Sequence, residues 1–222
     1  MSNILEGARD LNEKYSMGKP KPTVEDVLKL IKQHTFGCVV AGGFCRDTFF
    51  GVTPKDIDIC VYDFYPDDYA EGVLLQSLQH KLDKLGVGFT NVSSQFDECD
   101  EEYLVNDARV HEVWKLAGLN VDIILYNGCK TWRDVVMKFD FNLNQFYLPS
   151  TVPDFDSERP YNPSLEEAPV YVGLYPLDEL WQTKEGLTHE RIVKMQDKFT
   201  HFYPALPNQV MSEFNDDDFI PY

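Results

Sequence analysis

Apolar side chains recur every three or four residues in three stretches of the chain, the spacing that gives a helix one buried face. Thr23 and Asp26 form a capping-box pattern at the start of the first stretch, because each side chain can accept a hydrogen bond from the other residue's N–H. The predicted helices cover residues 24–34, 67–85 and 188–201, with a shorter one at 131–137. The residues expected to face the core are Val73, Leu74, Leu78, Leu82 and Leu85 in the second helix, and Ile192, Met195 and Phe199 in the last.

Short apolar runs between these helices predict β-strands. Ala117 and Gly118 separate the last two runs and are typical of a tight reversal, so those strands are expected to pair antiparallel. The runs lie at residues 38–41, 57–61, 88–92, 109–116 and 119–126. Strands and helices in this order indicate an α+β fold, in which a mixed or antiparallel sheet is flanked by helices.

Two segments show neither the helical nor the strand pattern of apolar residues. Residues 1–20 mix charge, Gly and Pro and are expected to form a loosely held arm, and residues 150–169 are rich in Pro, Ser, Asp and Glu and predict a long loop. We therefore expect a head domain with its arm over 1–150, a loop and helix packed on the head over 151–207, and a flexible acidic tail over 208–222.

The formal charge of −17 argues against broad electrostatic binding of nucleic acid, which needs clustered Lys and Arg, so any RNA contact must be local. Two small basic clusters are interpreted as solvated faces: Lys130, Arg133 and Lys138, and Arg191, Lys194 and Lys198. No apolar run approaches the roughly 18 residues of a membrane span and no leader opens the chain, so we expect no membrane partner and a cytoplasmic location. The cysteines are odd in number and lack zinc spacing, which indicates reduced core thiols.

Residues 42–58, GGFCRDTFFGVTPKDID, contain the most concentrated candidate chemistry. Gly42 and Gly43 follow an apolar run and let the backbone turn tightly into a helix, whose free N–H groups suit a phosphate. Asp56 and Asp58 are two residues apart at the start of a predicted strand, so both carboxylates lie on one face. This layout is suited to phosphoryl transfer with a divalent metal.

Asp122 is the natural third carboxylate. It lies in the apolar run VDIIL, where an unpaired carboxylate would be costly to bury and a metal would remove that cost. The alternative is that Asp122 lies on the solvent face of its strand. The glycine pair and the Asp-x-Asp upstream favour the metal interpretation.

The same stretch resembles the opening motif of class II CCA-adding enzymes and the bacterial poly(A) polymerase head domain, which belong to the polymerase-beta-like nucleotidyltransferases. Residues 139–144 resemble the family's RRDFTINA element, and residues 191–199 resemble the helix that begins its neck. The paired arginines of RRDFTINA are reduced to Lys138, so triphosphate or base contacts are expected to differ. The matched positions are Gly42, Gly43, Arg46, Asp47, Gly51, Pro54, Lys55, Asp56 and Asp58, then Asp140, Phe141 and Asn144.

The resemblance implies a polymerase-beta-like fold and a magnesium-dependent enzyme that moves a nucleoside monophosphate from an NTP to an acceptor hydroxyl, most simply an RNA 3′ end. It implies that Asp56, Asp58 and Asp122 ligate two Mg²⁺ ions, for which Mn²⁺ can substitute. The alternatives are nucleotidylation of a protein or small molecule, and a non-catalytic adaptor. The short chain speaks against terminal tRNA repair.

The resemblance also implies a nucleotide-binding set. Arg46 and Lys55 would add charge at the phosphates, although Arg46 equally suits a scaffold ion pair with Asp47 or Asp58. Asp140 and Asn144 would meet the ribose or base, or cap the helix that follows. The full set is Gly42, Gly43, Arg46, Lys55, Asp140 and Asn144.

The end of the chain resembles the C-terminal tip of bacterial single-stranded DNA-binding proteins, in which acidic residues precede an apolar end. The resemblance implies docking onto a DNA-metabolism protein, in a bacterial cell or a virus-infected bacterial host. An adaptor would act through this tail. Its residues are Asp216, Asp217, Asp218, Phe219, Ile220, Pro221 and Tyr222.

Overall fold

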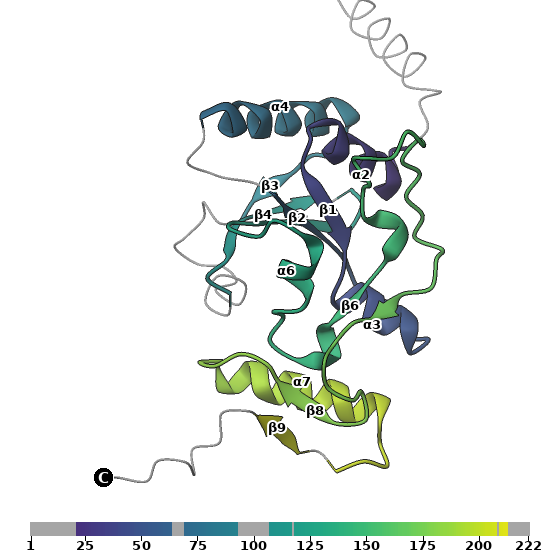
Figure 1. Ribbon diagram of the computed structural model, residues 1–222, viewed down its shortest axis with the longest axis vertical. Helices are drawn as coiled ribbons and strands as arrows, with labels where there is room; N and C mark the ends of the chain where they lie inside the picture. Colours follow the sequence, from purple (N-terminus) through teal and green to yellow (C-terminus); the bar gives the residue numbers. More distant parts are fainter. Residues whose placement is uncertain (1–20, 64–68, 93–106, 117, 208, 213–222) are drawn as a thin grey trace, which may run out of the picture.

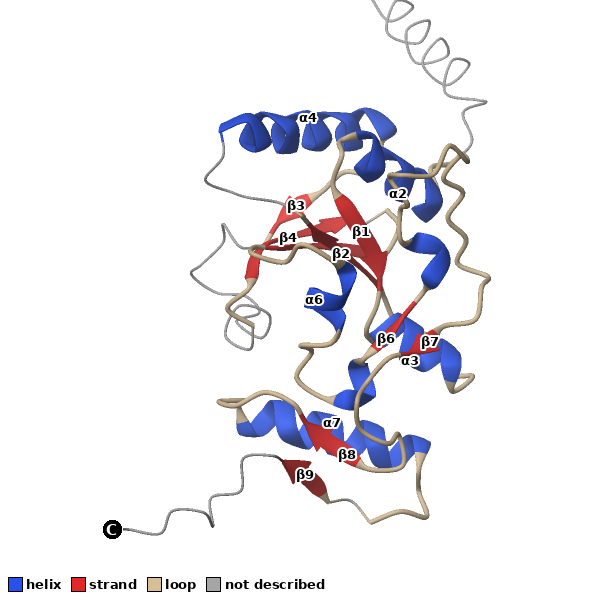
Figure 2. Cartoon of the chain, in the orientation of Figure 1, coloured by secondary structure: helices blue, strands red, loops and turns tan. Residues whose placement is uncertain are grey.

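The protein is built around a five-stranded sheet in the order β1-β2-β5-β4-β3 (Figures 1 and 2). The computed structural model describes residues 21–63, 69–92, 107–116, 118–207 and 209–212. The strands are β1 (Gly37–Val40), β2 (Ile57–Tyr62), β3 (Thr90–Asn91), β4 (Val110–Leu116) and β5 (Val121–Tyr126). β2 and β5 are parallel and the other neighbours antiparallel, including the predicted β4–β5 pair. The α+β class with a mixed sheet flanked by helices is confirmed.

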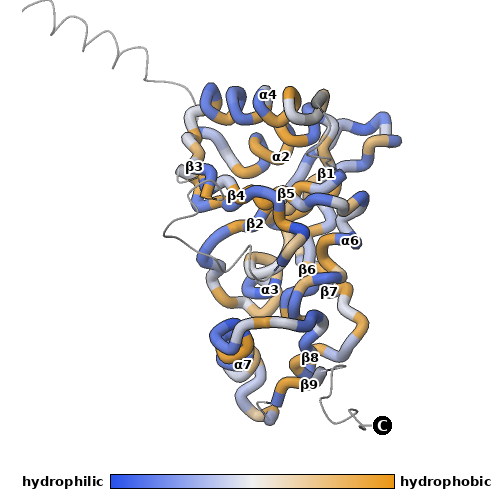
Figure 3. The backbone as a smooth tube through the Cα atoms, turned by 90° about the vertical axis from the view of Figure 1, so that its left-hand side faces the viewer, coloured by the Kyte–Doolittle hydropathy of each residue, from blue (hydrophilic) through white to orange (hydrophobic). Residues whose placement is uncertain are grey.

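Helices α2 (Val24–Gln33) and α4 (Tyr69–Leu85) pack against one face of the sheet (Figure 1). The predicted capping box of α2 is present, because Thr23 Oγ1 accepts from Asp26 N at 3.2 Å and Asp26 Oδ2 accepts from Thr23 N at 3.0 Å. The strands of the sheet are mostly hydrophobic, whereas α4 alternates between hydrophilic and hydrophobic turns (Figure 3). The buried side chains between these helices and the sheet, such as Leu28, Leu78 and Trp114, form the larger hydrophobic core.

One prediction for α4 is wrong. Leu78 and Leu82 are buried as expected, but Val73 is 48% exposed. Consecutive helix residues differ by roughly 100° in direction, so a residue next to the buried stripe can lie at its edge and face solvent. Leu74 faces the core, and Val73 faces solvent.

The opposite face of the sheet is covered by α6 (Trp132–Val136), the short helix that the sequence predicted, and Thr131 caps its start. After α6 the chain passes through η1 (Asn142–Asn144), β6 (Phe146–Tyr147) and η2 (Pro149–Thr151). The predicted loop follows, and its Tyr161 hydroxyl donates to the carbonyl of Thr151 at 2.7 Å. The loop ends at β7 (Val170–Tyr171), which pairs with β6.

The C-terminal part lies below the sheet in Figure 1 and consists of β8 (Leu180–Gln182), α7 (His189–Phe202) and β9 (Val210–Ser212). Met195 and Phe199 of α7 are buried against Phe141, Leu143 and Leu180, which confirms the predicted stripe of this helix. A small third core thus joins α7 to the segment around η1.

The four cysteines in the described part of the chain, Cys38, Cys45, Cys60 and Cys129, are buried free thiols. None of the described helices combines the length and hydrophobicity that a bilayer-spanning helix requires. The predicted N-terminal arm, Cys99 and residues 213–222, which include the partner-binding residues of the acidic tail, lie outside the described residues. Near the start of the predicted flexible tail, Val210–Ser212 form β9, which pairs with β8.

Candidate active site

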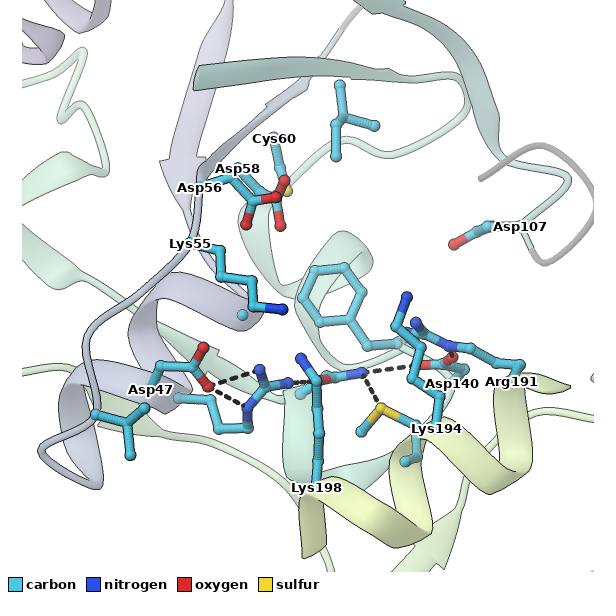
Figure 4. A pocket seen from close by; sticks show the side chains of 18 of the residues that line it. Asp47, Lys55, Asp56, Asp58, Cys60, Asp107, Asp140, Arg191, Lys194 and Lys198 are labelled. Carbon is cyan, nitrogen blue, oxygen red and sulfur yellow. Dashed lines mark hydrogen bonds and ion pairs between the residues drawn. The ribbon is translucent and has the colours of Figure 1, made fainter. Parts of the chain in front are cut away.

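A cavity of about 540 Å³ lies between the sheet and α7, and we call it the central cavity. This volume is in the range of small-molecule sites. Figure 4 shows Asp56 and Asp58 on one side of it and the side chains of α7 on the other. The predicted residues that line the cavity are Gly42, Gly43, Arg46, Lys55, Asp56, Asp58, Asp140 and Asn144.

Gly42 makes the turn from β1 into α3 (Gly43–Phe49) with φ +75° and ψ −128°. L side chains rarely adopt a positive φ, so this turn requires glycine. Its N–H donates to the carbonyl of Phe146 at 3.0 Å, which fixes the turn against β6. A Cβ on Gly42 would lie 3.8 Å from Asp58 Oδ2. The turn therefore presents bare backbone beside the carboxylates.

Replacing Gly42 by alanine is expected to destabilise the protein by about 1–3 kcal/mol, because the backbone must keep a strained conformation. Gly43→Ala is the matched control: Gly43 lies in a helix without a positive φ, and its Cβ would be 3.7 Å from Arg46 Nη2. The control should change stability by no more than about 1 kcal/mol. Urea unfolding of both variants checks this, and equal losses would contradict the strain at Gly42.

Asp58 has a strongly shifted pKa. Its Oδ1 is inaccessible to solvent and has no hydrogen-bond partner among the described residues. Burial, with the negative charges of Asp56 and Asp122, raises the pKa of the Asp58 carboxyl to about 7. A buried oxygen of this kind gains from a cation that replaces its lost water.

The third predicted carboxylate, Asp122, lies beside Asp58 because residues 58 and 122 are register partners in the parallel β2–β5 pair. Asp122 is 8% exposed, so the alternative of a solvent-facing Asp122 is wrong. It does not line the central cavity, and no group of three His, Cys, Asp or Glu in the described part of the chain encloses a metal position. Asp122 thus acts on Asp58 through its charge in this structure.

The donor set fits magnesium. Mg²⁺ takes oxygen ligands and is commonly bound by one or two carboxylates together with substrate phosphates. Asp56 and the unpartnered Oδ1 of Asp58 supply two such carboxylates at the cavity wall. The fit depends on this unsatisfied buried oxygen.

Arg46 forms the scaffold ion pair that the sequence left open, with Asp47 as partner. Its side chain is 2% exposed, and its Nη2 lies 2.6 Å from Asp47 Oδ1. Its Nη1 donates to Asn144 Oδ1 at 2.6 Å. Asn144 Nδ2 donates to Asp140 Oδ1 at 3.0 Å, and Arg191 Nε donates to Asp140 Oδ2 at 2.5 Å. We call Asp47, Arg46, Asn144, Asp140 and Arg191 the polar chain.

The polar chain joins α3 to α7 through Asn144 of η1 and through Asp140, which lies two residues before η1. Arg46, Asp140 and Asn144 all contribute atoms to it. Their observed contacts are thus within the protein, while their side chains also border the cavity.

Arg191, Lys194 and Lys198, which the sequence analysis interpreted as a solvated face, all line the central cavity; Lys194 is exposed, and Arg191 and Lys198 are partly buried. Their spacing places them on the α7 side that faces the sheet, next to the buried Met195. The signal in the sequence was the resemblance of residues 191–199 to the neck helix. The cluster of Lys130, Arg133 and Lys138 is exposed, as predicted.

Lys198 has an unusual environment. Burial, with the positive charge of Arg46, lowers the pKa of the Lys198 ammonium to about 8. Lys184 also lines the cavity and lies 3.5 Å from Asp107 Oδ1, and neither residue was singled out in the sequence. The carboxylates on the sheet side thus face several cations across the cavity.

Comparison with known proteins gives distant structural neighbours. Neither a protein-family model nor a curated protein matches the chain. A tRNA-processing enzyme complex is 13% identical with a TM-score of 0.45 over 80% of this chain and 42% of that one. The apo form I of a tRNA-processing enzyme is 16% identical with a TM-score of 0.43, over 96% and 45% of the two chains.

The Thermotoga maritima CCA-adding enzyme complexed with tRNA is 18% identical, with a TM-score of 0.35 over 55% of this chain and 24% of that one. The chain therefore spans less than half the length of these three structures. At such identities and TM-scores the likeness concerns the fold alone, and no activity of this chain follows from it.

Proposed function

We propose that the protein is a magnesium-dependent nucleotidyltransferase that moves a nucleoside monophosphate from an NTP to an acceptor hydroxyl. The observation that carries the proposal is the unpartnered Oδ1 of Asp58, which lies with Asp56 at the wall of a cavity that cations line on the other side. A Mg²⁺-nucleotide has the matching charges, with a cation for the carboxylates and phosphates for the lysines.

Each part of the site has a role in this reaction. Asp56 and Asp58 would hold Mg²⁺, and Asp122 would add negative charge behind Asp58. When bound, the metal lowers the pKa of the acceptor hydroxyl and neutralises the pyrophosphate that leaves. Gly42 has no Cβ, so phosphate oxygens can approach its backbone closely. Phe139 lines the same cavity and offers an apolar surface for the ribose or base.

The acceptor that we propose is the 3′ hydroxyl of an RNA, following the motif resemblance at residues 42–58 and 139–144. Incubation with labelled NTPs, Mg²⁺ and mixed RNA should give labelled RNA. Label on protein or on a small molecule instead would keep the enzyme class and replace the acceptor.

Asp56→Asn is the variant for this test, because it removes one carboxylate charge and keeps the shape. Transfer should fall by about 100-fold or more, since a metal contributes several kcal/mol to stabilising the transition state. Asp83→Asn, an exposed aspartate on α4, is the control and should transfer like wild type. Absence of transfer from wild type to every acceptor, or equal transfer by Asp56→Asn, would refute the proposed function.

A further inference from the structure

The cations of the central cavity differ in how far the protein already neutralises them. Arg46 is the cation that the motif resemblance would assign to the triphosphate. Its Nε and Nη2 lie 2.8 and 2.6 Å from Asp47 Oδ1, and its Nη1 lies 2.6 Å from Asn144 Oδ1. With 2% exposure, the guanidinium has little surface to offer a ligand. The polar contacts of the Arg46 guanidinium named here are thus made to the side chains of Asp47 and Asn144.

Lys55 and Lys198 are placed differently. Figure 4 shows their side chains pointing into the cavity from opposite walls, Lys55 from the segment before β2 and Lys198 from α7. Within the described part of the chain, no hydrogen bond or ion pair joins the ammonium group of either lysine to the protein. Both are therefore available as hydrogen-bond donors to a ligand.

The charges around Lys198 favour an anion. Those that act on it most strongly belong to one carboxylate, Asp47, and to three cations, Arg46, Lys194 and Arg191. This local excess of positive charge contrasts with the formal charge of −17 for the whole chain. A bound anion would offset the repulsion among these groups.

Lys198 is also close enough to the carboxylates for its charge to act on Asp58. An anion between Lys55 and Lys198 would thus lie beside the proposed magnesium position. A triphosphate matches this arrangement, because its α-phosphate can meet the metal while the β- and γ-phosphates extend toward the lysines.

We infer that Lys198, acting with Lys55 across the cavity, binds the β- and γ-phosphates of the nucleotide, and that Arg46 serves as a positioning residue. This inference rests on the proposed function and names a triphosphate-binding residue contributed by α7. The side chain of Arg46 donates a hydrogen bond to Asn144, and Asn144 donates one to Asp140. Asp140 in turn accepts one from Arg191 on α7. The polar chain thereby sets where Lys198 stands relative to the sheet.

The test measures the binding of ATP, ADP and AMP with Mg²⁺ by calorimetry. Lys198→Gln should weaken ATP binding by about tenfold or more, the value of a lost charge-assisted hydrogen bond, and AMP binding by less than about twofold. Lys198→Arg should restore most of the ATP affinity. Lys84→Gln, which removes an exposed lysine at the end of α4 outside the cavity, should bind all three nucleotides like wild type.

A second readout locates the contact. Acylation of lysines with an amine-selective reagent, followed by mass spectrometry, should show that ATP with Mg²⁺ protects Lys198 while AMP does not. If wild type binds ATP but Lys198→Gln binds it equally well, or Lys198 is acylated equally with and without ATP, this inference fails and the proposed function stands. If wild type binds no nucleotide, the proposed function fails with it.

Discussion

Replacing Asp58 by asparagine is expected to make the metal-free protein more stable at pH 8 while abolishing its activity. The pKa of Asp58 is about 7 in the folded protein against 3.8 for the ordinary group. The folded state thus binds this proton more tightly than the unfolded state, and the resulting stability is present below about pH 4 and is lost as the pH rises through 7. Asparagine removes that loss because it cannot ionise.

A pKa unit is about 1.4 kcal/mol, and partial solvent access and the coupling to Asp56 and Asp122 reduce the full effect, so we expect a gain of about 2 kcal/mol at pH 8. The gain should shrink at pH 5, where wild-type Asp58 is itself protonated. Urea unfolding in EDTA at both pH values measures it. An equal change at both pH values, or a loss at pH 8, would contradict the burial of this carboxylate.

The same variant separates stability from function. Mg²⁺ should raise the melting temperature of wild type, because a ligand that binds only the folded state stabilises it, and it should leave Asp58→Asn nearly unchanged. Nucleotidyl transfer should fall by about 1000-fold, which corresponds to about 4 kcal/mol of lost transition-state stabilisation. A variant that keeps the Mg²⁺ shift would exclude Asp58 as a ligand.

Replacing Asp140 by alanine is expected to cost about 3 kcal/mol of stability and to loosen α7. Asp140 is 9% exposed and accepts hydrogen bonds from both Asn144 and Arg191. Its removal leaves the Arg191 charge without this carboxylate, and breaking a buried pair from one side costs more than the pair itself contributes. Asp140→Asn keeps the acceptor for Asn144 and should lose less.

Urea unfolding measures the loss, and amide hydrogen exchange should show faster exchange along α7 than along β2 and β5. Glu190→Ala is the control: Glu190 is exposed in the first turn of α7, and its removal should cost no more than about 1 kcal/mol. Equal losses in Asp140→Ala and Glu190→Ala would show that the polar chain does not hold α7.

Much of the fold could be predicted from local pattern. The capping box of Thr23 and Asp26, the antiparallel β4–β5 pair and the buried stripe of α7 depend on residues within a few positions of one another, and all are present. Val73 was misassigned because an apolar residue beside the stripe of α4 looks like a member of it, although only the helix rotation decides which residue faces the sheet.

The candidate site could be predicted only in part. The motif over residues 42–58 contains the glycine turn and both Asp56 and Asp58, so these candidate residues could be found from one short segment. The cations on α7 were interpreted as a solvated face because basic residues at helical spacing usually lie on the exposed side of a helix. Their position over the cavity follows from Met195 and Phe199, which turn the helix toward η1.

By itself, the sequence determined most of the elements, the α+β class and the closeness of Asp56 and Asp58, because periodicity and spacing act over a few residues. Only the tertiary structure decided that Asp122 lies beside Asp58, that Arg46 is held by Asp47 and Asn144, and that Lys198 faces the cavity. These are contacts between segments far apart in the chain. A local pattern indicates which side chains are apolar or charged, whereas the register of the sheet and the packing of the small core under α7 decide which partner each side chain contacts.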